Sequence, residues 1–130
     1  MKPLMDLFEL GGRVFIALIF VTAGYSKIGG YAGTAAYMES TGVPGLLLPL
    51  VIALELGGGL LIIAGFQTRI VAFLLSGFCL LSAALFHNNF ADQMQSILFM
   101  KNIAIAGGFL FLVVHGAGPF SVDGKLKKTD

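Results

Sequence analysis

Charge is scarce in this sequence, and its scarcity defines the broad class of the protein. Of the 130 residues, 12% are charged and 57% are hydrophobic, and the mean hydropathy is +0.92. A soluble globular domain carries about 25% charged residues. The net charge of +1 offers no basic patch for nucleic acid, and the composition excludes both disorder and an ordinary water-soluble core. The sequence therefore predicts an integral membrane protein.

Cysteine and tryptophan are almost absent as well. The single cysteine, Cys79, cannot form an internal disulfide or a CxxC redox pair, and we expect it to pack in the interior. There is no tryptophan, but the twelve phenylalanines suit contact with hydrocarbon. His87 and His115 fall at opposite ends of their apolar runs, too far apart to hold one haem, and no group of residues has the spacing of metal ligands. We therefore expect no metal.

Long apolar runs are present, and short polar or glycine-rich segments separate them. Four runs approach the roughly 20 residues that a helix needs to cross a bilayer: residues 10–28, 46–65, 70–86 and 97–115. A helix satisfies its own backbone groups inside lipid, and no run shows the alternation of a membrane strand. We predict an all-α membrane protein, a four-helix transmembrane bundle that forms one domain over residues 1–130. Residues 31–40 predict a short interfacial helix between the first and second spans.

The distribution of basic residues predicts the orientation of the chain. Six lysines and arginines fall on one side and two, Lys27 and Lys101, on the other. Because the cytoplasmic side of a membrane protein carries the excess of basic residues, both termini are expected in the cytoplasm, with residues 119–130 as a basic tail. We expect the first span to remain uncleaved, because Asp6 and Glu9 precede it where a signal peptide carries net positive charge.

Polar and small residues recur at helical spacing within the spans. The first span places five such residues on one face: Arg13, Ala17, Phe20, Gly24 and Lys27. Two similar faces are expected, one in the third span and one in the fourth: Arg69, Phe73, Ser76, Leu80, Ala83 and His87, and Lys101, Ala104, Gly108, Leu112 and His115. These faces fit a packed bundle interior, and packing alone does not require the acidic residue of the second span, Glu55.

Glu55 falls near the midplane of its span, roughly 13 Å deep. An unpaired carboxylate there costs at least ~2.5–3.5 kcal/mol, so we expect it to face the interior. Lys101 is the expected nearest basic partner and Arg13 the second choice, while Lys27 and His87 extend the polar cluster towards the outer rim. A structural ion pair and a binding or proton-handling role both remain open.

Several segments together carry a resemblance to a known family. They are the first-span face ending at Lys27 and the strings YMESTGVP, ELGGGLLIIAGFQTR, HNNF, MKNIAIAGG and GAGPFSVD. The chain resembles the DoxX family of small bacterial inner-membrane proteins over nearly its whole length. The resemblance implies a four-helix membrane bundle and places six residues at recurring polar positions: Arg13, Lys27, Glu55, His87, Lys101 and Asn102. It also implies a link to quinone-dependent or thiol-stress redox systems, and it brings no cofactor with it.

Functions of different classes fit these features. The first is an accessory or quinone-interacting subunit of a membrane redox or stress-response system, at most part of an oxidoreductase and not a stand-alone enzyme. An apolar interior with a few convergent polar groups is typical of a small-molecule pocket. No cofactor is evident, and quinone is the ligand that such a pocket would suit. Membrane lipids, redox subunits or a second copy of the chain are the expected partners. The alternatives are a small proton-coupled exporter that uses the midplane glutamate, or a purely structural membrane interaction partner.

Overall fold

The computed structural model describes residues 2–87 and 89–128, with the side chains of residues 127 and 128 left outside that description. Every regular element in these residues is helical, which confirms the all-α class. The elements follow in this order: α1 (Lys2–Gly29), α2 (Tyr31–Ser40), the 3₁₀-helix η1 (Gly45–Leu47), α3 (Leu48–Ile52), the π-helix η2 (Ala53–Gly57), α4 (Gly58–Ala64), α5 (Thr68–Phe86), α6 (Gln93–His115) and α7 (Val122–Lys128).

Three helical stretches among the described residues are long and apolar enough to cross a membrane: Gly45–Ala64, Thr68–Phe86 and Gln93–His115. They coincide closely with the second, third and fourth predicted spans. The first predicted span falls within α1, which is 28 residues long but does not belong to this apolar group. Helix α1 begins at Lys2, earlier than the predicted span, with Pro3 in its first turn, where a missing backbone N–H costs nothing. Helix α6 also begins about one turn early, because the Asp92 side chain accepts the backbone N–H of Met94 and caps it.

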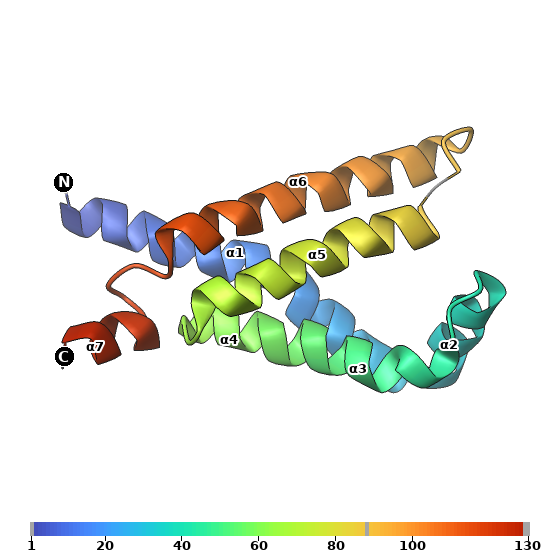
Figure 1. Ribbon diagram of the computed structural model, residues 1–130, viewed down its shortest axis with the longest axis horizontal. Coiled ribbons are helices and arrows are strands. Elements are labelled where there is room, and N and C mark those ends of the chain that lie inside the picture. Colours follow the sequence, from blue (N-terminus) through green and yellow to red (C-terminus); the bar gives the residue numbers. More distant parts are fainter. Residues whose placement is uncertain (1, 88, 129–130) are drawn as a thin grey trace.

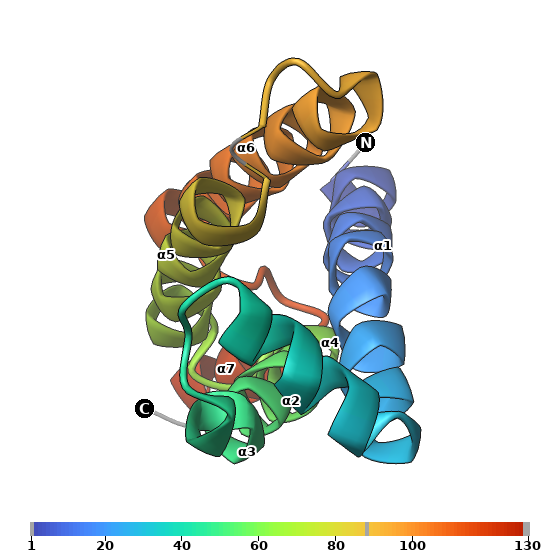
Figure 2. The same ribbon diagram turned by 90° about the vertical axis from the view of Figure 1, so that its right-hand side faces the viewer.

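The helices form two packed layers that meet at one end of the molecule. Helices α5 and α6 lie along each other as an antiparallel pair, while α1 lies along η2 and α4 (Figure 1). Viewed from the end, α1 and the α5–α6 pair stand on opposite sides, with α3 and α4 below them (Figure 2). Both termini lie at one end, and α2, the end of α5 and the start of α6 lie at the other.

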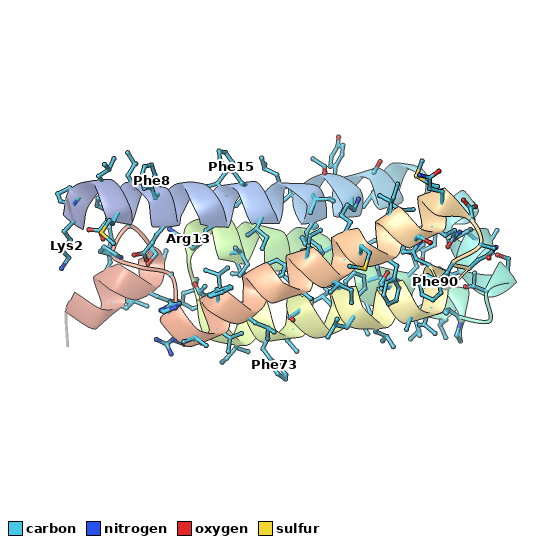
Figure 3. The ribbon with its side chains drawn as sticks, turned by 90° about the horizontal axis from the view of Figure 1, so that it is seen from above. Lys2, Phe8, Arg13, Phe15, Phe73 and Phe90 are labelled. Atoms are coloured by element: carbon cyan, nitrogen blue, oxygen red, sulfur yellow. The ribbon has the colours of Figure 1, made fainter. Side chains whose placement is uncertain are left out.

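The packed interior is small, as expected for a chain whose outer surface contacts lipid. Its centre joins α1 to α6 through the tilted ring pair Phe20 and Phe109, whose centroids are 5.4 Å apart. Cys79 packs in this core, as predicted. Large side chains instead cover the outside, where Phe15 is 77% and Phe73 63% exposed, and both point away from the bundle (Figure 3).

The predicted inward faces are correct for α1 and correct only in part for α5 and α6. The buried residues of α1 are Arg13, Ala17, Phe20 and Gly24, all on the predicted face. In α5 the prediction is confirmed at Ser76 and Ala83, which are buried, and wrong at Phe73 and Leu80, which are exposed. In α6 it is wrong at Lys101 and Ala104, both exposed, since α6 packs mainly on α5 and buries the face of Ala106 and Phe109 instead.

The end of the molecule that carries the termini is tied together by Arg13 and Asp123. Arg13 is buried and donates from Nη1 to the carbonyl oxygens of Ile62 and Ile63, at 2.9 and 3.0 Å, and from Nη2 to that of Phe120. Asp123 accepts the backbone N–H groups of Gln67 and Thr68, both at 2.9 Å, and so caps α5 from α7. These contacts hold the C-terminal segment against the α4–α5 turn.

Candidate functional site

The candidate site is built around an ion pair between the first helix and the π-helix. Lys27 Nζ lies 2.6 Å from Glu55 Oε1, with the lysine side chain 28% and the glutamate side chain 6% exposed. Lys27 belongs to the last turn of α1, and Glu55 is the central residue of η2. The carboxylate faces the interior, as predicted, and its partner is Lys27.

The predicted pairings of Glu55 with Lys101 and with Arg13 are therefore wrong. Lys101 is exposed on α6, on a face that the packing against α5 turns away from the interior. Arg13 lies in the first turn of the apolar part of α1, and backbone carbonyl oxygens at the terminal end of the molecule accept its hydrogen bonds. Helical spacing indicated which residues share a face, but not which helices become neighbours.

Two local features bring the pair together. A π-helical turn contains more residues than an α-helical one, so it changes the direction of the side chains that it carries, and such turns are frequent at functional sites. On the other helix, Gly24 allows close approach: a Cβ at this position would lie 2.7 Å from the backbone nitrogen of Leu56 and 2.9 Å from its Cβ. Gly24 thus holds α1 against η2 one turn before Lys27.

The ion pair forms part of the wall of an apolar cavity of about 520 Å³. Helix α2, the α3–η2 stretch and the second half of α5 supply nearly all of the remaining lining. Helix α4 packs on α5, whereas α3 diverges from it towards the α2 end (Figure 1). Three lining leucines are largely exposed: Leu50, Leu74 and Leu81. The cavity therefore opens sideways, between α3 and α5, onto the surface that faces lipid.

His87 contributes a further polar group to the same cavity. It is the C-cap residue of α5 and is partly buried, and its Nδ1 atom is buried without a hydrogen-bond partner among the described residues. A buried ring nitrogen without a partner is costly, and a ligand in the cavity would satisfy it. Of the six predicted polar residues, the structure thus brings Lys27, Glu55 and His87 together.

The other three predicted site residues lie elsewhere. Asn102 is half-buried and Lys101 exposed on α6, a helix that contributes nothing to the lining of this cavity. Arg13 lies at the end of the molecule that carries both termini, where its hydrogen bonds join α1 to the C-terminal segment. Within the described residues no cluster of three or more histidine, cysteine, aspartate or glutamate side chains has the arrangement of a metal site.

The fold and the site define a small helical membrane protein in which one lateral apolar cavity holds a buried ion pair. The sequence profile of the DoxX family matches residues 8–88, a segment that includes Lys27, Glu55 and His87, and the chain belongs to this family. It is 54% identical to "Inner membrane protein YqjF" of Escherichia coli (strain K12) over 128 residues, 98% of each chain. These findings support a location in a bacterial inner membrane.

Two further relatives are more distant. "Inner membrane protein YphA" of Escherichia coli (strain K12) is 37% identical over 118 residues, covering 85% of this chain and 84% of the relative. "Putative oxidoreductase CatD" of Bacillus subtilis (strain 168) is 40% identical over 70 residues, 52% of each chain. No solved structure shows significant similarity to this chain.

Proposed function

We propose that the chain binds the headgroup of a membrane quinone in the lateral cavity and serves as an accessory subunit of a redox system in the inner membrane. The observation that carries the proposal is the Lys27–Glu55 pair at the wall of an apolar, sideways-open cavity. A quinone is a flat apolar ring with two carbonyl acceptors, so it needs an apolar slot and one donor for each carbonyl. Lys27 supplies one donor, and His87, which lines the same cavity, supplies the other.

Each polar residue has a distinct role in this proposal. Lys27 donates to one carbonyl oxygen and regains its proton from water at its exposed side, while the Glu55 carboxylate accepts the lysine's hydrogen bond and holds it in place. When the quinone is reduced, two electrons arrive from a partner subunit and two protons reach the carbonyl oxygens through Lys27 and His87. The name of CatD, which describes that relative as an oxidoreductase, is consistent with a redox setting.

The membrane arrangement that accompanies this function is a bundle of four crossing helices. In it α1 crosses beside η2 and α4, α2 lies at the outer interface as the roof of the cavity, and both termini are cytoplasmic. The support is that both termini lie at one end of the molecule and α2 at the other, together with the six-to-two distribution of basic residues.

The test is quinone binding by the purified chain in lipid nanodiscs. The probe is a short-chain quinone with a photoreactive group, and the crosslinked peptides are mapped by mass spectrometry. We expect labelling on α2 and the second half of α5, and Lys27→Met should weaken binding at least about tenfold through the loss of one charge-assisted hydrogen bond. Lys101→Met is the matched control, because it removes an exposed lysine outside the cavity.

Two results would overturn the proposal. One is equal labelling of the Lys27→Met and Lys101→Met proteins, which would mean that the ion pair does not take part in binding. The other is a substrate-driven proton flux in proteoliposomes that depends on Glu55, which would favour the exporter instead.

A further inference from the structure

A second cavity, of about 600 Å³, lies at the opposite end of the molecule between α1 and α6. Its polar lining consists of Glu9, Arg13 and His115. His115 is the last residue of the apolar helix α6, so this cavity lies where a membrane helix ends, at the depth of the lipid headgroups. The apolar part of its wall, at Ile16 and Phe111, continues towards the hydrocarbon.

The charges around this cavity are separated rather than paired. Arg13 is 1% exposed, and the three acceptors of its hydrogen bonds are neutral carbonyl oxygens. Its Nε atom has no hydrogen-bond partner among the described residues. Glu9, one turn earlier on α1, is exposed, and no ion pair within 4.0 Å joins it to Arg13 in the described part of the chain. The cavity thus presents a cation and a carboxylate that no ion pair joins, and Asp123 is a second carboxylate whose charge acts on Arg13.

A ligand that matches this arrangement must carry both charges and an apolar tail. We propose that the cavity binds a phospholipid whose headgroup combines a phosphate with a primary ammonium group, as in phosphatidylethanolamine. The phosphate lies at Arg13 and His115, the ammonium group at Glu9, and an acyl chain passes Ile16 and Gly108. Gly108 allows α1 and α6 to approach closely beside the cavity, because a Cβ at this position would lie 2.8 Å from Ile16 Cδ1.

The same chemistry distinguishes this lipid from the other abundant headgroups. A phosphatidylglycerol headgroup has no cation for Glu9 and suffers repulsion from its carboxylate. A choline headgroup carries a cation without N–H donors, so it forms no hydrogen bond with the carboxylate. The preference therefore depends on Glu9, and the affinity for all three lipids depends on the phosphate contact.

The experiment is native mass spectrometry of the full chain, delipidated in detergent and titrated with phosphatidylethanolamine, phosphatidylglycerol and phosphatidylcholine of identical acyl chains. We expect the ethanolamine lipid to bind about tenfold more tightly than the other two, the effect of one charge-assisted hydrogen bond. Glu9→Gln should remove the preference, and His115→Ala should weaken all three lipids. Glu39→Gln, an exposed glutamate on α2, is the matched control and should change nothing.

Several outcomes would overturn the proposal, provided that the circular dichroism spectra show folded variants. They are equal or tighter binding of phosphatidylglycerol, an unchanged preference in the Glu9→Gln protein, and unchanged affinities in the His115→Ala protein. Free phosphoethanolamine is the competitor that tests the source of the headgroup. Competition at the concentrations at which the lipid binds would assign the cavity to a soluble ligand.

Discussion

The Lys27–Glu55 pair predicts an unequal response to the loss of either partner. In the Lys27→Met protein the Glu55 carboxylate, with a side chain 6% exposed, loses its partner in an apolar setting. Breaking a fully buried pair in this way costs about 3–5 kcal/mol, which is the upper limit for this part-buried pair. In the Glu55→Gln protein the amide oxygen still accepts a hydrogen bond, and the lysine, 28% exposed, extends its charged end towards water. We expect a cost of about 1 kcal/mol there.

The double variant tests the same reasoning by a second route. Replacing Lys27 by methionine and Glu55 by leucine together leaves an apolar pair with no uncompensated charge, so its cost should be smaller than that of Lys27→Met alone. The assay is equilibrium unfolding in mixed micelles with increasing dodecyl sulfate, followed by circular dichroism. The exposed Lys101→Met variant is the control and should stay within about 0.5 kcal/mol of the parent protein.

The reasoning is refuted if Lys27→Met costs no more than Glu55→Gln. It is also refuted if the coupling energy from the cycle of Lys27→Met, Glu55→Leu and their double variant is below about 0.5 kcal/mol, the level at which independent sites add. Either result would mean that the two side chains do not stabilise each other in the folded protein.

Three further predictions concern the helix contact, the tail and the topology. Gly24→Ala should cost about 1–3 kcal/mol and weaken quinone binding, because the new methyl group collides with the Leu56 backbone, while Gly107→Ala, with nothing within 4 Å, should be neutral in the same unfolding assay. Burial raises the pKa of Asp123, but the backbone N–H groups of Thr68 and Gln67 outweigh it, so the net pKa lies below the usual value. Because the pKa of Asp123 is lower in the folded chain than in the unfolded chain, the stabilisation by its carboxylate is complete above about pH 4 and is lost as the pH falls through the folded-state pKa. The protection of the Gln67 and Thr68 amides from hydrogen exchange should decrease over the same pH range. A reporter that is active only outside the cytoplasm, fused to the C-terminus, should be silent.

Each of these has a contrary outcome. Equal costs for the two glycine substitutions would show that α1 and η2 are not held by close approach at Gly24. Amide protection that persists in an Asp123→Asn protein would show that the carboxylate does not cap α5. An active C-terminal reporter would overturn the proposed orientation.

The sequence predicted the helices and one helix face well, since both depend on local information. Span length and hydropathy located three long apolar helices. The inward face of α1 was recognisable because Gly24 and Ala17 interrupt large apolar residues at helical spacing, and small residues permit close helix contact.

The partner of Glu55 depended on information that is not local. The packing of the whole chain decides which helix lies beside η2. A π-helical turn sets the direction of the Glu55 side chain, and no residue pattern in Ala53–Gly57 predicts that turn. The one available signal was Gly24: a glycine on the inward face of α1, three residues before Lys27, indicates a close neighbour at that level. In α6 the polar residues Lys101 and His115 suggested an inward face, but both are exposed and the core contact is apolar.

The hydrogen bonds of Arg13 impose an order on the folding of the protein during its synthesis. Arg13 is made with the first helix, but two of its acceptors come 49 and 50 residues later and the third 107 residues later. Without these acceptors the guanidinium at headgroup depth keeps water as its hydrogen-bond partner. The last acceptor, Phe120, is made 107 residues after Arg13, so this end of the bundle closes only after the helices that precede Phe120 have been made.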